Sequence, residues 1–529
     1  MGASEIGAAR TEDTTITIDY AAQGRVLNPF WACFGYDEPN YTYGRDGTKL
    51  LSELAALSPV PVYVRCHNLL TSGDGKPSLK WGSTNAYTED TQGHPVYDWH
   101  LVDSIFDTYV SRRMKPLAEI GFMPEALSTR PHPYRHYWHP GVAYDSIYTG
   151  WAWPPSDYRK WGELVRQWVR HSVQRYGEKE VASWLWEVWN EPNISYWKGT
   201  EAEYFTLYDY TAEAVKSALP SALIGGPAST GPGWNKAANW LQDFLVHCHE
   251  GINAATGKKG APLDFISYHA KGSPRFVDGH VRMNMNPQLA DVSRGFAIVK
   301  ASSFGQLPIY ITECDPEGCA ACGMATNPEN AYRNGTMYSS YTAASFTRIA
   351  DLADSMGVNL AGAMSWSFEF EGQKWFDGLR DLATNGVDKP VLNVFRMFGM
   401  MRGRRIAAGG AGDVFAAADK HSLWVMSWDY TDDDLPGEGQ QRRIVVRNLP
   451  AKKVKLMEFL IDENHSNAYT AWKKMGSPQA VTEAQYKELE AAGHLQPAGT
   501  PVTMEVKDGA LTIPLTLSRQ AVELVQLEF

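Results

Sequence analysis

Residues 186–193, which read WEVWNEPN, decide the fold. The apolar residues of this stretch predict a buried strand, and Pro192 ends it because proline has no backbone N–H to donate to a sheet ladder. Similar runs alternate with longer amphipathic stretches along most of the chain. Short strands that are buried on both faces and separated by helices predict an α/β fold, a (β/α)8 barrel rather than an open sheet. The predicted barrel strands are 31–36, 60–66, 115–122, 183–189, 222–227, 265–269, 308–313 and 361–368.

The chain changes character after about residue 403. Short stretches of alternating apolar and polar residues, separated by turn residues, predict an antiparallel β-sandwich. Residues 14–20 alternate in the same way and are expected to pair into this sheet. We therefore predict a barrel domain at 25–400 and a discontinuous sandwich domain made of 1–24 and 401–529. The predicted sandwich strands are 422–430, 441–448, 454–462, 501–506, 511–517 and 521–529.

The composition is that of a globular protein. The 529 residues are 44% hydrophobic and carry a net charge of −11, which argues against a nucleic-acid or anionic-membrane partner. No stretch approaches the roughly 20 apolar residues that a membrane span needs. The first ten residues contain no basic segment followed by an apolar one. A cytoplasmic location is therefore the default expectation, or a periplasmic or secreted one if a leader has been cleaved.

Cysteine and aromatic residues indicate what kind of site to expect. Six cysteines are too few for a disulfide framework. Cys319 and Cys322 have CxxC spacing without a second half-site, which indicates a loop staple or two free thiols rather than zinc. We expect neither a metal nor an organic cofactor. The 19 tryptophans and 26 tyrosines suit either a carbohydrate site, where sugar faces stack on rings, or a tryptophan-rich core.

Polar side chains recur where the predicted barrel strands end. Barrel active sites are built at the carboxyl ends of the strands, so these side chains are expected to surround one mouth. Each of them alone has an ordinary structural explanation, but so many together favour a site. The set comprises Asp37, His67, Glu119, Asn190, Glu191, His269, Glu313 and Glu369.

Two of these glutamates have the chemistry of glycoside cleavage. Desolvation at an aromatic-lined mouth is expected to raise the pKa of Glu191, as a general acid for a poor leaving group requires. Asn190 can hydrogen-bond a sugar 2-hydroxyl. Glu313 ends a strand about three βα units later and would face Glu191 across the barrel. A separation of about 5–5.5 Å would predict retention through a covalent intermediate. An ionised Glu313 needs donors, which Tyr268, His269 or Tyr332 could supply.

The motifs together resemble a known family. The strand ends Asn190-Glu191-Pro192 and Thr312-Glu313, together with His269, are similar to the clan A retaining glycoside hydrolases. Over nearly the whole chain, the sequence resembles glycoside hydrolase family 39. This resemblance implies a barrel with a sandwich, and an activity from a family of chiefly β-xylosidases, with α-L-iduronidases and a few other glycanases. It is carried by residues 116–124 (PLAEIGFMP), 186–193 (WEVWNEPN), 462–469 (DENHSNAY) and 517–520 (LSRQ).

The resemblance also implies roles for individual residues. Glu191 would be the acid/base, Glu313 the nucleophile and Asn190 the partner of the sugar 2-hydroxyl. Residues 366–372, which read WSFEFEG, depart from the usual family sequence, so the contact with distal hydroxyls is open between two glutamates. For the histidines and the tryptophan of the −1 subsite, an ordinary place in the core is the alternative. The implied substrate-binding residues besides Asn190 are His67 and His269, Trp366 as the floor, and Glu369 or Glu371.

Three functions remain in view. The first is a retaining exo-β-xylosidase acting on xylo-oligosaccharides, expected to be a monomer, with a homo-oligomer as the alternative. Eight Tyr or Trp residues within 134–158 favour it, because they predict a wall that narrows the site, unless this insertion packs only on itself. The second keeps the mechanism with an α-L-arabinoside or α-L-iduronide, although Lys374 and Arg380, the cations offered to a uronate, lie among acidic residues. The third is a non-catalytic glycan-binding protein.

Overall fold

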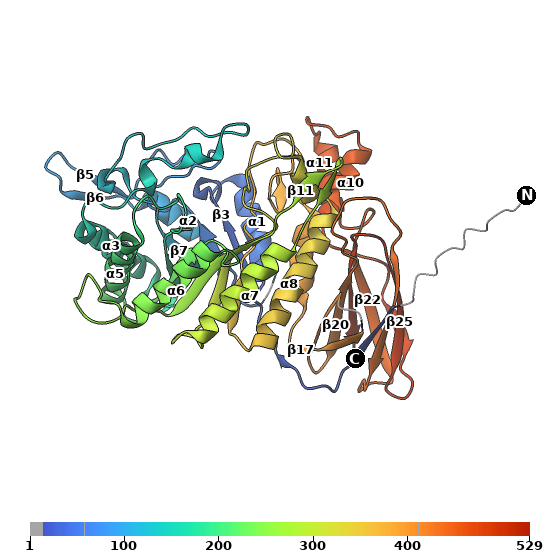
Figure 1. Cartoon of the computed structure of the whole chain (residues 1–529). Helices are drawn as coiled ribbons and strands as arrows, with labels where there is room; N and C mark the ends of the chain where they lie inside the picture. Colours follow the sequence, from blue (N-terminus) through green and yellow to red (C-terminus); the bar gives the residue numbers. More distant parts are fainter. Residues whose placement is uncertain (1–13, 58, 411–412) are drawn as a thin grey trace, which may run out of the picture. The chain divides into compact units, whose positions relative to one another are not determined.

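The computed structural model describes residues 14–57, 59–410 and 413–529, and it divides the chain into two compact units (Figure 1). The first unit comprises Pro29–Asn334 and Arg348–Asp388. The second comprises Met1–Asn28, Gly335–Thr347 and Lys389–Phe529. Helix α8 (Thr336–Met356) is thus shared between the units, and helix α9 (Pro390–Met400) belongs to the second.

The first unit is a closed barrel of parallel strands, which confirms the predicted fold class. Its eight strands are neighbours in chain order, as a (β/α)8 barrel requires. The barrel closes where Phe34 pairs in parallel with Ser365, whose carbonyl accepts a hydrogen bond from the N–H of Gly35 at 2.9 Å. The strands are β3 (Cys33–Tyr36), β4 (Tyr63–Cys66), β7 (Lys115–Ile120), β8 (Leu185–Val188), β9 (Leu223–Ser229), β10 (Phe265–Lys271), β13 (Ile309–Asp315) and β14 (Leu360–Ala363).

Helices α3, α5, α6 and α7 lie on the outer side of these strands in Figure 1. The helices of the first unit are α1 (Arg45–Ala55), α2 (His100–Val110), α3 (Tyr158–Tyr176), α4 (Glu178–Val181), α5 (Glu201–Ala218), α6 (Asn235–Glu250), α7 (Asn286–Ala301) and the end of α8. Its loops carry the short strands β5 (Tyr87–Glu89), β6 (Pro95–Tyr97), β11 (Arg275–Val277), β12 (His280–Arg282), β15 (Ala383–Thr384) and β16 (Val387–Asp388).

Helix α3 illustrates how the local sequence forms the outer ring. Asp157 caps it, because its carboxylate accepts hydrogen bonds from the backbone N–H groups of Arg159 at 2.8 Å and Lys160 at 3.2 Å. The helix ends at Gly177, whose φ of 90° lies in the left-handed region that favours glycine. Its buried side chains recur every three or four residues and give one apolar face, formed by Trp161, Leu164, Val165, Trp168 and Val169.

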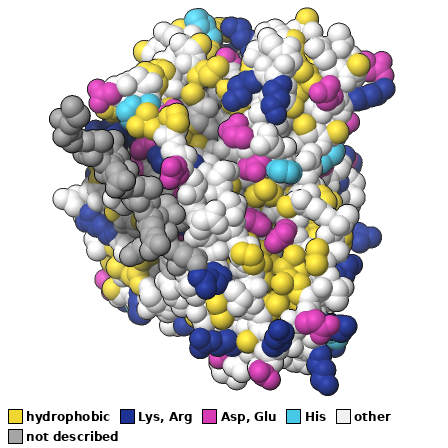
Figure 2. Space-filling model, turned by 90° about the vertical axis from the view of Figure 1, so that its right-hand side faces the viewer, with side chains coloured by type: hydrophobic (Ala, Val, Ile, Leu, Met, Phe, Trp, Pro, Cys, Tyr) yellow, Lys and Arg dark blue, Asp and Glu magenta, His cyan; other side chains and the backbone are white. Residues whose placement is uncertain are grey.

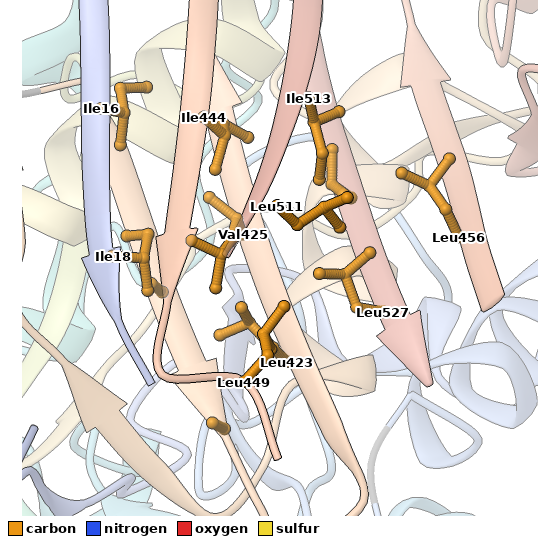
Figure 3. Packing of buried hydrophobic residues seen from close by; sticks show 14 of the residues in the cluster. Ile16, Ile18, Leu423, Val425, Ile444, Leu449, Leu456, Leu511, Ile513 and Leu527 are labelled. Carbon is orange, nitrogen blue, oxygen red and sulfur yellow. The ribbon is translucent and has the colours of Figure 1, made fainter. Parts of the chain in front are cut away.

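The second unit contains two packed sheets, the sandwich expected from the sequence. A core of aliphatic side chains fills the space between them, including Ile16, Ile444, Ile513 and Leu527 (Figure 3). One sheet has the order β18 (Ala408–Gly410), β1 (Thr14–Asp19), β21 (Gln440–Arg447) and β25 (Leu511–Leu517). The other has the order β2 (Arg25–Val26), β17 (Arg404–Ile406), β19 (Val414–Ala418), β20 (Ser422–Trp428), β26 (Val522–Glu528), β22 (Lys453–Ile461) and β23 (Gln496–Pro497), with β24 (Val502–Glu505) beside β22.

Strand β1 joins the sandwich as predicted, but one of its pairings is parallel. It runs antiparallel to β18 and parallel to β21. Antiparallel neighbours are usually joined by a short turn, whereas β1 reaches this sheet from the other end of the chain. No hairpin therefore fixes its direction. The helices α10 (Ala468–Lys474) and α11 (Glu483–Gly493), between β22 and β23, were not predicted from the sequence.

The surface mixes charges of both signs. Figure 2 shows Lys and Arg side chains interspersed with Asp and Glu side chains over one face, with hydrophobic side chains gathered between them. Within the described part of the chain, no helix has the length and apolar character that crossing a membrane demands.

Candidate active site

The two predicted glutamates meet at the carboxyl ends of the barrel strands. Glu191 follows β8, and Glu313 lies near the end of β13. The Nδ1 atom of His269, on β10, is 2.8 Å from Oε1 of Glu191 and 3.8 Å from Oε1 of Glu313. One carboxylate oxygen from each glutamate and a ring nitrogen of His269 all lie within 4.8 Å of one another. Such a short separation suits a retaining mechanism, because an inverting pair must leave room for a water molecule.

The backbone after β8 takes an unusual course that turns Glu191 toward the mouth. Trp189 and Glu191 have φ angles of 68° and 43°, in the left-handed region that costs a residue other than glycine about 1–3 kcal/mol. Hydrogen bonds stabilise this course. The N–H of Trp189 donates to the carbonyl of Ile120 at 3.1 Å, and the N–H of Glu191 donates to that of Ala228 at 2.8 Å. The side chain of Glu191 is 14% exposed and opens into a cavity.

Glu313 is buried among cationic side chains. Its Oε2 is 2.6 Å from Nζ of Lys271, and its Oε1 is 3.4 Å from Nη1 of Arg65 and 3.5 Å from Nε2 of His67. Burial alone would raise the pKa of Glu313. The charges of His269 and Lys271 and the hydrogen bond from His67 outweigh it and hold this pKa well below its usual range. The carboxylate is therefore ionised, as a nucleophile must be.

The donors expected for Glu313 were only partly correct. His269 lies nearby, but the Tyr268 hydroxyl donates instead to the backbone carbonyl of Val292 at 3.3 Å. Successive side chains of a strand point to opposite faces, so Tyr268 points to the outside of the barrel when His269 points inward. Lys271, the shortest contact, was not predicted.

A buried arginine organises the layer beneath the two glutamates. Arg65 pairs with Glu119 at 2.8 Å and also with Glu187. Its Nη2 donates to Oδ1 of Asn190 at 3.0 Å. This bond orients the Asn190 amide, whose Nδ2 is buried and has no hydrogen-bond partner among the described residues.

Two neighbouring groups in this layer have pKa values that move in the same direction. Burial raises the pKa of Glu119 to about 8; the charges of Glu187 and Glu313 add to this effect, and His67 and Arg65 oppose it. Burial lowers the pKa of His67, but Glu119, Asp37 and Glu313 outweigh it and raise this pKa to about 9. Near neutral pH, His67 is a cation that hydrogen-bonds Asp37 and faces Glu313.

Glu191 and Glu313 open into a cavity of about 280 Å³. This is close to the lower end of small-molecule pockets, roughly 300 Å³. Tyr144 and Tyr148, from the insertion predicted to narrow the site, form part of its wall. So does Cys319, which is disulfide-bonded to Cys322; the sequence had left this pairing open. The cavity is lined by Asp37, His67, Lys80, Tyr144, Tyr148, Glu191, Ile194, Tyr196, Lys271, Glu313, Gly318, Cys319 and Trp366.

Trp366 is held in place from several sides. Its Nε1 donates to Oδ1 of Asp37 at 3.2 Å, and its backbone N–H donates to Oδ1 of Asp315 at 2.9 Å. The guanidinium carbon of Arg65 lies 4.9 Å from its ring centroid, and the ring of His67 lies 4.5 Å away. A ring fixed in this way forms a rigid part of the cavity lining.

Gly35 leaves the space that this ring occupies. A Cβ atom there would lie 2.3 Å from two carbon atoms of the Trp366 ring. We therefore expect Gly35→Ala to displace the ring and lower kcat/KM by about 100-fold, the scale of loss for a misplacement near 1 Å. Gly499→Ala, at a position with open space around it, is the control and should keep wild-type kinetics. Unchanged kcat/KM in Gly35→Ala would show that the position of the Trp366 ring does not matter for the reaction.

Neither glutamate of the 366–372 loop lines this cavity. Glu369 is buried and accepts a hydrogen bond from the N–H of Gly386 at 2.7 Å. Glu371 accepts hydrogen bonds from the N–H groups of Asp46 at 2.6 Å and Gly47 at 3.1 Å, in the first turn of α1. It lines a separate cavity of about 620 Å³. Their contact with distal sugar hydroxyls stays a prediction.

The cations at the cavity differ from those considered in the sequence. Lys374 is exposed, and Arg380 is buried and donates from Nε to the carbonyl of Trp366 at 2.9 Å. The cavity is lined instead by Lys80 and Lys271. Glu191, His269 and Glu313 are close enough to share a metal ion, but Lys271 and Arg65 already neutralise this cluster, so we assign no metal to it.

A closed (β/α)8 barrel with two glutamates facing each other at its mouth is typical of glycoside hydrolases. The family model of glycosyl hydrolases family 39 matches residues 14–509, and the chain belongs to this family. It is 28% identical over 480 residues to a β-xylosidase of Geobacillus stearothermophilus, covering 88% of this chain and 86% of that one. It is 27% identical over 496 residues to a β-xylosidase of Caldicellulosiruptor saccharolyticus, covering 91% and 92%.

A solved structure agrees with this assignment. The monomeric β-xylosidase of Caulobacter crescentus CB15 superposes with a TM-score of 0.78 at 25% sequence identity. The superposition covers 97% of this chain and 99% of the other. The barrel and the accessory sheets of this chain thus share the fold of that β-xylosidase.

Proposed function

We propose that this chain is a retaining exo-β-xylosidase that removes β-D-xylose from the non-reducing ends of xylo-oligosaccharides. The observation that carries the proposal is the approach of one Glu191 oxygen to within 4.8 Å of one Glu313 oxygen, in a cavity of about 280 Å³. The β-xylosidases among its relatives support xylose as the sugar.

The reaction proceeds by double displacement. A carboxylate oxygen of Glu313 attacks the anomeric carbon while the bond to the leaving oxygen breaks, and Glu191 donates its proton to that oxygen. This step gives an α-xylosyl ester on Glu313. Glu191, now a carboxylate, takes a proton from water, and the water oxygen attacks the same carbon. The ester bond breaks, β-xylose leaves, and both glutamates return to their starting states.

Other residues of the site hold the sugar for these steps. The unpartnered Nδ2 of Asn190 donates to the 2-hydroxyl, a contact that strengthens in the oxocarbenium-like transition state. Trp366 supports the flat face of the ring. His67 and His269 fix the sugar and the two carboxylates relative to each other.

A uronide is the second candidate, because Lys80 and Lys271 line the cavity. Both ammonium groups are already paired, however. Lys80 binds Asp37, and Lys271 binds Glu313 and Asp315. A sugar carboxylate would have to compete with these buried partners, so the charge balance favours a neutral pentose.

Two assays test the proposal. Aryl β-D-xyloside, α-L-arabinoside and α-L-iduronide are compared side by side, and the xyloside is expected to give the highest kcat/KM. Xylotetraose labelled at its reducing end is then followed over time. Exo-action from the non-reducing end should first release unlabelled xylose and labelled xylotriose. Xylobiose as the first product would exclude exo-action, and binding of xylotetraose without any product would indicate a glycan-binding protein.

A further inference from the structure

Lys271 contacts two carboxylates of the neighbouring strand. It is the last residue of β10, two positions after His269, so both side chains point to the same face of the strand. Its Nζ is 2.6 Å from Oε2 of Glu313 and 3.2 Å from Oδ2 of Asp315. The side chain is only 18% exposed, so water weakens these charge interactions little.

Asp315 extends this contact to the tryptophan of the site. Its Oδ2 faces Lys271, while its Oδ1 accepts the hydrogen bond from the backbone N–H of Trp366. One ammonium group therefore connects Glu313 to the carboxylate that fixes Trp366. These contacts cross three neighbouring strands of the barrel: Lys271 lies on β10, Glu313 and Asp315 lie on β13, and Trp366 follows β14.

The other cations near Glu313 cannot replace this contact. Arg65 is shared with Glu119 and Glu187, and His67 is shared with Glu119 and Asp37. Both of these cations, and His269 as well, approach Oε1 of Glu313. Among the described residues, Lys271 is the cation that contacts Oε2.

We propose that Lys271 is a positioning residue, whose ammonium group keeps Glu313 ionised and aimed at the anomeric carbon and joins it, through Asp315, to Trp366. The proposal rests on the proposed role of Glu313 as the nucleophile. The low pKa of Glu313 is consistent with it: burial acts in the opposite direction, and the charge of Lys271 is one of the effects that overcome burial.

The direction of the expected pH effect follows from the groups around Glu313. Burial and the neighbouring carboxylates raise the pKa of Glu313, and the ammonium charge of Lys271 lowers it. Removing that charge therefore raises this pKa. Since the ionised carboxylate attacks, activity at acid pH falls and the acid limb of the pH profile moves to higher pH. The other charged or titratable groups among the described residues that face Glu313 or Lys271 are Arg65 on β4, His67 directly after it, His269 on β10, Cys314 and Asp315 on β13, Asp291 on α7, Glu119 on β7, and the loop residues Asp37 and Glu191.

The test measures the first chemical step alone. A 2-deoxy-2-fluoro-β-xyloside with a dinitrophenyl leaving group needs no proton from Glu191, and it traps the covalent intermediate. Its rate of trapping as a function of pH therefore reports the ionisation of Glu313. We expect Lys271→Met to move the acid limb up by about 1–2 pH units. At pH values below the limbs of both proteins, the variant should then be trapped about 10- to 100-fold more slowly than the wild type. Lys271→Arg should restore the wild-type limb.

Controls separate this role from a structural one. Lys258→Met removes the same charge from an exposed loop of the barrel and should leave the limb unchanged. A uniform loss of rate in Lys271→Met, with a lower Tm and no shift of the limb, would overturn the proposal. If that variant does not fold, Lys271→Gln is measured instead, with the same shift expected. Peptide mass spectrometry of the trapped wild-type enzyme tests the underlying function, because labelling at a residue other than Glu313 would overturn the proposed mechanism itself.

Discussion

Glu313→Ala is expected to lower kcat on aryl β-xyloside by several orders of magnitude, on the order of 10⁴-fold or more, because the covalent step loses its nucleophile. The fold should survive the change. Lys271 keeps Asp315 as a partner, and Arg65 keeps Glu119 and Glu187, so no buried cation is left unpaired. Initial rates and a thermal unfolding curve check the two parts of this expectation.

Azide gives the Glu313→Ala variant a distinctive product. The small anion fits where the carboxylate was and attacks the anomeric carbon from that side, so an activated β-xyloside should yield an α-xylosyl azide. Glu250→Ala, which removes an exposed carboxylate at the end of α6, is the matched control and should keep wild-type rates. Near wild-type turnover in Glu313→Ala without azide would rule out Glu313 as the nucleophile.

The barrel could be predicted because its strands are buried on both faces. Short runs made mostly of apolar residues, such as 183–189 and 308–313, mark such strands without any knowledge of their partners. Alternation likewise marked β1 as a strand of the sandwich. It could not give the direction of pairing, because alternation depends on which face is buried and not on whether the neighbouring strand is parallel.

The candidate site was predictable to the extent that its residues lie at strand ends. Glu191 and Glu313 follow apolar runs, so the topology alone brings them to one mouth. Lys80 comes from a loop between β4 and β5, and only the folded chain brings it to Asp37. The place of Lys271 near the site could have been predicted, because a residue two positions after His269 points to the same side of the strand. Its role still depends on Glu313 and Asp315, which belong to another strand.

Glu191→Ala is expected to separate the two steps of the reaction. Cleavage of xylobiose, whose leaving group must be protonated, should slow by about 10²- to 10⁴-fold, the usual contribution of general acid–base catalysis. A dinitrophenyl β-xyloside should still transfer its sugar to Glu313 and release a burst of dinitrophenol. The intermediate then persists because no base activates water. Stopped-flow absorbance measures the burst and the slow phase after it.

Azide also distinguishes the roles of the two glutamates. In Glu191→Ala it needs no base, and it attacks the xylosyl ester from the side opposite Glu313, so the expected product is a β-xylosyl azide. The two alanine variants should therefore give opposite anomers from the same substrate, α without Glu313 and β without Glu191. This contrast follows from the facing positions of the two carboxylates around His269. An α-xylosyl azide from Glu191→Ala would mean that Glu313 does not form the covalent intermediate, whatever the loss of rate in either variant.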